Sequence, residues 1–199
     1  MTSFNEMYEG TPPWDIGRPQ PMLVRLVEDG ALRGGPVLDV GCGTGENSLF
    51  LAAKGFDVTG VDSAPRAIAK AKRKARDRKL KASFLVHDAF ALAALKKRFG
   101  SVIDSGLFHV FGNRERVRFR NQLYAVMRPG GTYFMMCMSE KEPAEWDGPR
   151  RVTRPEVRAA FALPKFRVRS IAEVRFATNM HEDGAYAYLC TIERADEKS

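Results

Sequence analysis

The stretch Val37-Leu-Asp-Val-Gly41-Cys-Gly43-Thr-Gly45 decides the fold of this 199-residue chain. A short apolar strand pattern runs into glycines at alternate positions, and a helical pattern follows over residues 45–54. Glycines at a strand-to-helix turn let the backbone approach a ligand without collisions from Cβ atoms. The stretch therefore predicts a ligand site at the carboxyl end of a buried strand.

The charges in and beside this stretch indicate what kind of ligand the turn accepts. A dinucleotide site of the G-x-G-x-x-G type needs a small residue at position 46, where this chain has Glu46. Asp39 adds a second negative charge. Both carboxylates are unfavourable beside a pyrophosphate and favour a ligand that carries positive charge. A nicotinamide-dependent oxidoreductase is therefore a poor match.

Outward from this stretch, strand and helix patterns alternate, which predicts a mostly parallel sheet with helices on both faces. The connection 179–184 is too short for a crossover, so the last two strands must pair antiparallel. The expected fold is α/β, a seven-stranded Rossmann-like sheet with a C-terminal antiparallel hairpin, in one domain over residues 1–199. We expect strands at 36–40, 56–61, 83–87, 101–105, 132–138, 166–176 and 185–193, and helices at 21–30, 45–54, after a Ser63 cap, at 89–98, at 114–127 and after a Thr153 cap.

Polar residues follow the second and third expected strands, at the edge of the sheet where the glycine turn lies. Asp62 and Ser63 stand at the end of the second strand, and Asp88 stands at the end of the third. Open parallel sheets bind ligands at the carboxyl ends of their strands, where a carboxylate can accept hydrogen bonds from ribose hydroxyls. The alternative is that Asp62 and Asp88 only cap the helices that follow them.

The glycine stretch, Asp62, the pair Asp88-Ala89, the turn Arg128-Pro-Gly-Gly131 and the final hairpin together resemble the class I S-adenosylmethionine-dependent methyltransferases. The segments 11–19 (TPPWDIGRP), 104–109 (DSGLFH) and 148–153 (GPRRVT) are similar to the thiopurine and halide/thiol methyltransferase branch, above all to bacterial heterocyclic-toxin methyltransferases. The resemblance implies methyl transfer from S-adenosylmethionine to an oxygen, nitrogen or sulfur of a small aromatic heterocycle, without a metal.

The resemblance also implies roles for individual residues. Residues 1–20 and the loop 139–151 are expected to form a lid over the site. His109, just beyond the fourth strand, is the expected general base, since neutral imidazole suits that task; the alternative is local packing. The residues expected to bind the cofactor are Trp14, Arg18, Asp39, Gly41, Gly43, Gly45, Asp62, Ser63, Asp88, Ala89 and Ser105. Those expected to line the acceptor pocket, with core packing as the alternative, are Tyr8, Phe108, Phe111 and Trp146.

The remaining composition bounds the location and redox chemistry of the chain. Cys42, Cys137 and Cys190 are odd in number and lack C-x-x-C spacing, so neither a disulfide framework nor a zinc site is expected. The first residues lack the basic and apolar regions of a signal peptide, and no apolar run is long enough to span a bilayer. We expect a cytoplasmic monomer or homodimer without membrane contact.

The net charge of +8 lies in residues 66–81, which hold nine Lys or Arg and one Asp. One solvated helix face explains this excess, and the alternatives are a nucleic-acid or anionic surface and a contact with another protein. Enzymes that methylate exocyclic base nitrogens typically have an Asn/Asp-Pro-Pro-aromatic motif after strand four, where residues 104–107 are Asp-Ser-Gly-Leu. A small-molecule methyltransferase is therefore favoured over an RNA or DNA methyltransferase, and over a non-catalytic protein that only binds the cofactor.

Overall fold

A computed structural model describes residues 4–32, 35–143 and 148–195. One sheet of seven strands has the order β3-β2-β1-β4-β5-β7-β6. Neighbouring strands from β3 to β5 pair parallel, whereas β7 pairs antiparallel with both β5 and β6. This confirms the predicted sheet. The strands are β1 (Val37–Val40), β2 (Val58–Asp62), β3 (Ser83–Val86), β4 (Phe99–Ser105), β5 (Met127–Met138), β6 (Phe166–Phe176) and β7 (Ala185–Arg194).

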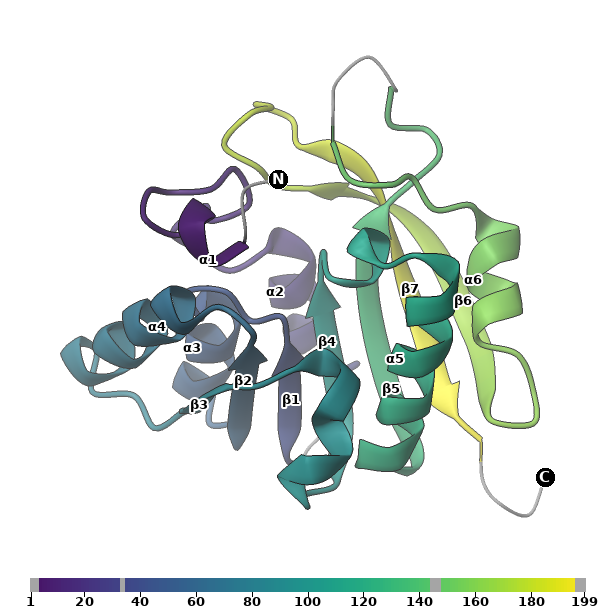
Figure 1. Cartoon of the computed structure of the whole chain (residues 1–199), viewed down its shortest axis with the longest axis horizontal. Helices are drawn as coiled ribbons and strands as arrows, with labels where there is room; N and C mark the ends of the chain where they lie inside the picture. Colours follow the sequence, from purple (N-terminus) through teal and green to yellow (C-terminus); the bar gives the residue numbers. More distant parts are fainter. Residues whose placement is uncertain (1–3, 33–34, 144–147, 196–199) are drawn as a thin grey trace.

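Helices cover both faces of this sheet (Figure 1). Alternate residues of β5 show how the two layers form: Phe134 packs in the cluster that contains Leu23, whereas Tyr133 packs in the cluster that contains Phe119. One layer consists of α2 (Pro21–Glu28), α3 (Glu46–Ala53) and α4 (Pro65–Asp77), and the other consists of the 3-10 helix η1 (Ala89–Leu95), α5 (Asn113–Val126) and α6 (Arg154–Ala160). Two short helices, α1 (Phe4–Met7) and η2 (Phe108–Val110), complete the described elements.

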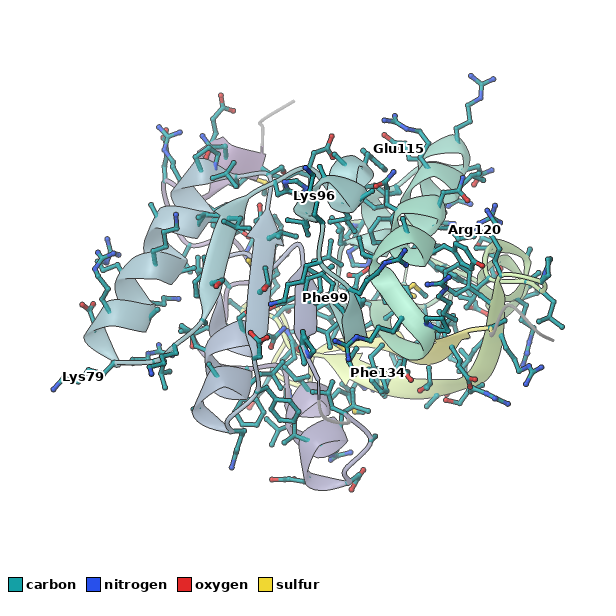
Figure 2. All side chains as sticks on the ribbon, turned by 90° about the horizontal axis from the view of Figure 1, so that it is seen from below. Lys79, Lys96, Phe99, Glu115, Arg120 and Phe134 are labelled. Carbon is teal, nitrogen blue, oxygen red and sulfur yellow. The ribbon has the colours of Figure 1, made fainter. Side chains whose placement is uncertain are left out.

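Burial explains why the strands form where the sequence predicts them. All four residues of β1 are buried, because a central parallel strand is covered on both faces. β6 is an edge strand whose outward residues include Arg167 and Glu173, and such charges discourage pairing with another chain. Figure 2 shows Phe99 and Phe134 between the ribbons, whereas Lys79 extends from the outer end of α4. In the described residues, no helix is long and apolar enough to cross a membrane.

Three local predictions need correction. β5 begins at Met127 instead of residue 132, because Met127 pairs with Phe99 and the turn at residues 128–131 forms an irregularity within the strand. The segment expected as a helix over 89–98 is a 3-10 helix that ends at Leu95 and contains a kink at Ala91. Residue 64, not Ser63, caps α4, and the carboxylate of Asp62 accepts its backbone N–H.

Candidate functional site

A cleft of about 610 Å³ lies at the carboxyl ends of β1, β2 and β4. The described part of the N-terminal segment supplies one side of it, including Tyr8 and Trp14. Figure 1 shows this segment, in purple, above the ends of the strands, beside the loop that joins β6 and β7. Gly148 and Pro149, from the loop expected to share in the lid, also line the cleft. The structure therefore brings both expected lid segments to one site.

The glycine turn forms the floor of the cleft. Gly41, Gly43 and Gly45 all line it, and all three have positive φ, at 72°, 54° and 85°. A Cβ atom on Gly43 would lie 2.8 Å from the Tyr8 hydroxyl oxygen, and one on Gly45 would lie 2.9 Å from a ring carbon of Phe84. Glycine is thus required here by the backbone conformation and by close packing from both sides of the turn.

Asp62 connects the glycine turn to the start of α4. Its Oδ2 accepts the backbone N–H of Gly43 at 2.9 Å, and its Oδ1 accepts that of Ala64 at 2.8 Å. Burial raises the pKa of this carboxyl, and the two N–H donors oppose that shift. Each carboxylate oxygen can accept a further hydrogen bond, and Asp62 lines the cleft. Asp62 therefore caps the next helix and still presents an acceptor to the cleft.

The ends of β3 and β4 supply the other predicted polar groups. Asp88 caps η1 by accepting the N–H of Phe90 at 2.8 Å, and it also lines the cleft beside Ala89. Ser63 and Ser105 line the same cleft. The Oγ atom of Ser105 is buried and has no hydrogen-bond partner among the described residues. A buried hydroxyl of this kind favours a polar ligand atom as its partner.

Asp39 does not line the cleft, which corrects its predicted place among the cofactor-binding residues. It is 1% exposed and accepts a 2.6 Å hydrogen bond from the Ser48 hydroxyl. Burial raises its pKa to about 7. Its side chain lies behind the glycine turn and holds β1 to α3. Motif position alone could not reveal this, because the direction of the side chain depends on the pleat of β1.

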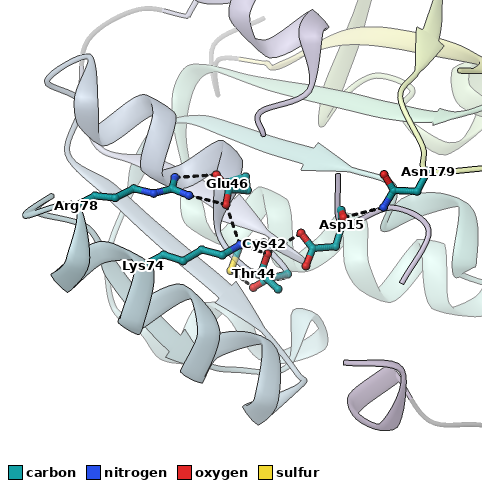
Figure 3. A network of polar contacts seen from close by, with 8 residues as sticks. Asp15, Cys42, Thr44, Glu46, Lys74, Arg78 and Asn179 are labelled. Carbon is teal, nitrogen blue, oxygen red and sulfur yellow. Dashed lines mark hydrogen bonds and ion pairs between the residues drawn. The ribbon is translucent and has the colours of Figure 1, made fainter. Parts of the chain in front are cut away.

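The N-terminal segment is tied to the glycine turn by a polar network that the sequence did not predict. The Thr44 hydroxyl donates to Asp15 Oδ1 at 2.8 Å and accepts from Lys74 Nζ at 2.7 Å. Asn179, in the loop between β6 and β7, donates from Nδ2 to the Asp15 carbonyl at 3.0 Å. Figure 3 shows this chain of contacts running from α4 to the C-terminal loop. Segments distant in the sequence therefore close one side of the cleft together.

Glu46 is the second centre of this network (Figure 3). Its carboxylate receives two hydrogen bonds from Arg78, at 2.8 and 2.9 Å, and an ion pair from Lys74 at 2.8 Å. These cations lower its pKa against the effect of burial. Two of the basic residues of 66–81 thus bind the turn that the cleft is built on. The sequence signalled Glu46 only as a residue that disfavours phosphate.

Aromatic residues of the N-terminal segment lie where the acceptor pocket and the cofactor site were expected to meet. The indole Nε1 of Trp14 donates to the Tyr8 hydroxyl at 2.9 Å. Tyr8 is buried, which raises its pKa. Arg18 is exposed at the edge of the cleft and is the one Lys or Arg among the described residues that line it. The carboxylates on this lining are those of Asp15, Glu46, Asp62 and Asp88.

This charge balance fits a ligand with positive charge, as S-adenosylmethionine has in its ammonium and sulfonium groups. Of the four carboxylates that line the cleft, Glu46 is paired with Lys74 and Arg78, which leaves Asp15, Asp62 and Asp88 against one guanidinium. Opposite charges attract across such a lining. Ser105 adds a buried hydroxyl without a described partner. Within the described ranges, no three His, Cys, Asp or Glu side chains are grouped as metal ligands.

His109 lies in the cleft wall, and its hydrogen bonding disfavours the predicted role of general base. Its Nδ1 accepts the backbone N–H of Met138 at 3.0 Å. A ring nitrogen that accepts a hydrogen bond carries no proton, so the neutral ring carries its proton on Nε2. Burial and the charge of Arg116 lower the pKa of His109 to about 3. A ring in this state is a hydrogen-bond donor and a weak base at neutral pH.

The predicted aromatic walls divide into three cases. Phe111 lines the cleft and packs against Phe90, with ring centroids 4.8 Å apart and ring planes tilted by 45°. Phe108 is fully buried against Phe161 and the guanidinium of Arg116, so its predicted place in the acceptor pocket is wrong. The 3-10 turn of η2 directs Phe108 inward, which no periodic pattern could show. Trp146 lies outside the described residues.

Comparisons with known proteins agree with this geometry. A family model described as a methyltransferase domain matches residues 37–131, which include the glycine turn and Asp62. The chain is 37% identical over 155 residues to 2-heptyl-1-hydroxyquinolin-4(1H)-one methyltransferase of Mycobacteroides abscessus, covering 77% of this chain and 68% of that protein. It is 32% identical over 124 residues to "Probable thiol methyltransferase 2" of Arabidopsis thaliana, covering 61% of this chain and 54% of that protein.

A solved structure is similar over more of the chain. It is described by the words "Conversion of a Disulfide Bond into a Thioacetal Group during Echinomycin Biosynthesis". The two chains are 34% identical and superpose with a TM-score of 0.87, over 96% of this chain and 91% of the other. The likeness therefore extends beyond the segment matched by the family model.

Proposed function

Since this chain belongs to the S-adenosylmethionine-dependent methyltransferases, we propose that it transfers the methyl group to a small aromatic heterocycle. The observation that carries the proposal is the composition of the cleft. Glycines and carboxylates form its floor, and aromatic or aliphatic side chains such as Phe111 and Phe176 form its wall. The relative from Mycobacteroides abscessus, whose name specifies a hydroxyquinolone, supports the choice of acceptor class.

The cofactor end of the cleft is assigned from the polar groups at the strand ends. Asp62 would accept from the ribose hydroxyls, because its oxygens retain acceptor capacity after binding Gly43 and Ala64. Asp88, with Ser63 and Ala89, would face the adenine. The backbone of the glycine turn allows the cofactor to approach closely. The Ser105 hydroxyl, which has no hydrogen-bond partner among the described residues, would form a hydrogen bond with the ligand.

The N-terminal segment would complete the site as a lid. Trp14 lines the cleft and could bind a cationic group through its ring face, which is worth about 0.5–2 kcal/mol. Its Nε1–H is occupied by Tyr8, which fixes the orientation of the indole. Arg18 would contribute the one guanidinium to the carboxylate of the cofactor. Asp15 would hold the lid closed through Thr44.

The chemistry follows from alignment and exclusion of water. When bound, the cofactor supplies a methyl group on a positively charged sulfur. The side chains of this protein would orient an acceptor in line with that methyl group, and such positioning can lower a barrier by about 7–11 kcal/mol. Phe90, Phe111 and Met138 would exclude water from the acceptor.

Transfer of a labelled methyl group from S-adenosylmethionine to a mixed panel tests the proposal. The panel holds hydroxyquinolones, phenols, quinols, thiols, halides and total RNA, each with and without the protein. We expect label on a hydroxyquinolone or another small aromatic heterocycle. Label on RNA alone would overturn the small-molecule proposal. Tight cofactor binding without label on any acceptor would instead support a protein that only binds.

A further inference from the structure

His109 is a buried titratable group in the cleft wall that has no role in the methyl transfer as proposed above. It lines the cleft yet is only 5% exposed, and it follows β4 at the end of the cleft away from β3. Its ring packs against Phe176, with centroids 6.3 Å apart, and its Cε1 lies near Gly106. These contacts hold the plane of the ring, so its polar atoms have fixed directions.

The hydrogen bond from Met138 fixes which ring nitrogen carries the proton. Because the backbone N–H of Met138 can only donate, Nδ1 must be the acceptor, and the proton lies on Nε2. No described residue forms a hydrogen bond with Nε2. A second proton on Nδ1 would place two donors against each other at 3.0 Å and would break this bond. The ring therefore presents a permanent N–H donor and no basic nitrogen.

The charges behind His109 favour an anion in front of it. Arg116 on α5 is 5% exposed, and burial and the charge of Arg150 lower the pKa of Arg116. Both arginines pair with the single carboxylate of Glu156. Two buried nitrogens of Arg116, Nε and Nη2, have no described partner. The other neighbours of the ring, Met138 on β5 and Phe176 on β6, do not titrate. The acid at the end of β4, Asp104, directs its carboxylate to the N–H groups of Leu107 and Phe108. The two arginines carry one positive charge more than the Glu156 carboxylate that they share.

We infer that His109 binds the acceptor as an anion through Nε2–H and acts as a hydrogen-bond donor, not as a base. The inference rests on the proposed function and narrows it to heterocycles that are ionised near neutral pH, such as N-hydroxy heterocycles and acidic thiols. The acceptor loses its proton to solvent before it binds. Its heteroatom then supplies the electron pair for the new bond to carbon, and the electron pair of the broken sulfur–carbon bond stays on sulfur. No proton moves to the protein.

The variants His109→Gln and His109→Leu distinguish a donor from a base. A glutamine amide can donate in place of Nε2–H but cannot accept a proton at neutral pH, whereas leucine does neither. We expect His109→Leu to lower kcat/KM for an ionised 1-hydroxyquinolin-4-one by about 10- to 100-fold, as for loss of a hydrogen bond to a charged group. We expect His109→Gln to recover activity to within about fivefold of the wild type.

The pH profile separates the two roles further. If His109 is a donor, wild-type kcat/KM follows the titration of the acceptor alone. At every pH above the pKa of the acceptor, His109→Leu then lowers kcat/KM by the same factor. A base would give the opposite pattern. Both variants would then lose activity equally with a phenol of pKa about 10, and neither would lose activity with an acceptor that is already ionised. That pattern overturns the inference.

Two controls keep the test independent of folding and of the proposed function. Each variant must bind S-adenosylhomocysteine within about twofold of the wild type, which excludes a collapsed site. The 15N shifts of the His109 ring in the wild type should show the Nε2–H form from pH 5 to 9, and protonation within that range contradicts the inference without any variant. Absence of transfer by the wild type to every heterocycle contradicts the proposed function itself.

Discussion

Asp62 shows how one side chain serves both the fold and the site. Its two oxygens receive the N–H groups of Gly43, in the glycine turn after β1, and of Ala64, directly before α4. The carboxylate thereby shapes the glycine turn and begins α4, and it presents its remaining lone pairs to the cleft. The sequence posed capping and ligand binding as alternatives, whereas the geometry allows both.

Replacing Asp62 with Asn should weaken cofactor binding while leaving the fold intact. The amide has one oxygen in place of two, so its NH₂ group must face a backbone N–H or the ligand. We expect the Kd for S-adenosylhomocysteine, measured by calorimetry, to rise by about 10- to 100-fold. The matched control is Asp57→Asn, an exposed carboxylate at the other end of β2 that pairs with Lys97. An unchanged Kd in folded Asp62→Asn would refute the assignment.

Asp39 should make the protein less stable as pH rises, whereas a carboxylate in an ion pair makes a protein less stable as pH falls. Its folded pKa, raised by burial to about 7, exceeds the ordinary value of 3.8. The folded state therefore holds a proton that the unfolded state releases between about pH 4 and pH 7. The contribution of Asp39 to the free energy of unfolding is fully present below about pH 4 and is lost as pH rises through about 7. The total loss is up to about 4 kcal/mol.

Urea unfolding of the cofactor-free protein from pH 4.5 to 8 measures this effect. Asp39→Asn cannot ionise, so we expect the variant to gain stability relative to the wild type as pH rises across this window. The exposed Asp57→Asn variant should show no such relative change. A difference between Asp39→Asn and the wild type that is constant with pH would mean that Asp39 ionises normally.

At the scale of elements, α4 links the N-terminal segment to the glycine turn. Arg66 pairs with Glu9 at 2.9 Å, and Lys70 donates to the carbonyl of Gly10 at 2.8 Å. One turn further along, Lys74 reaches Thr44 and Glu46. These residues stand at spacings of four along one face of the helix. Part of the positive charge that the sequence assigned to a solvated helix face therefore binds other segments of the same chain.

Lys74→Met should loosen the lid without disturbing the packing of α4. Its ammonium is partly buried, so losing two partners should cost about 1–2 kcal/mol in the free energy of unfolding, measured by urea titration. We also expect faster proteolysis within residues 10–20. Lys72→Met, two residues earlier and exposed, is the control. Equal behaviour of the two variants would show that Lys74 does not hold the segment.

The elements that sequence predicted well are those whose environment leaves a periodic pattern. Val37–Val40 reads as a buried strand because both faces are covered. Residues 166–176 read as a strand that pairs with 185–193, and the charged outward residues fit the edge position that the structure gives them. The start of β5 was missed because its pairing with Phe99 precedes a turn. The state of His109 was missed because its partner, Met138, is distant in the sequence and donates from the backbone.

At the scale of the whole molecule, the cleft joins segments from both ends of the chain. The N-terminal residues contact the glycine turn and α4, while the loop between β6 and β7 holds Asp15 through Asn179. The family resemblance could place the N-terminal residues over the site, whereas nothing in the sequence analysis joined the loop between β6 and β7 to them. Motifs could not show that α4 supplies the cations of the network, since that depends on helix packing.

The remaining surface charge provides a test of the nucleic-acid alternative. Lys72, Arg73 and Arg76 are exposed on α4 and make no ion pair with any other described residue. Because the cleft does not include them, replacing all three with Gln should leave transfer to a heterocycle within about twofold.

Any RNA retention by the wild type should be non-specific and salt-dependent. Each lost cation should then lower the slope of log K against log salt by about 0.7. Filter binding from 50 to 300 mM salt, beside the labelled-methyl assay, measures both quantities. If the wild type methylated RNA, and the triple variant lost that transfer while keeping its affinity for S-adenosylhomocysteine, α4 would be a docking surface for the acceptor. The excess charge would then be functional, because its exposed cations would bind the phosphates of an extended polyanion.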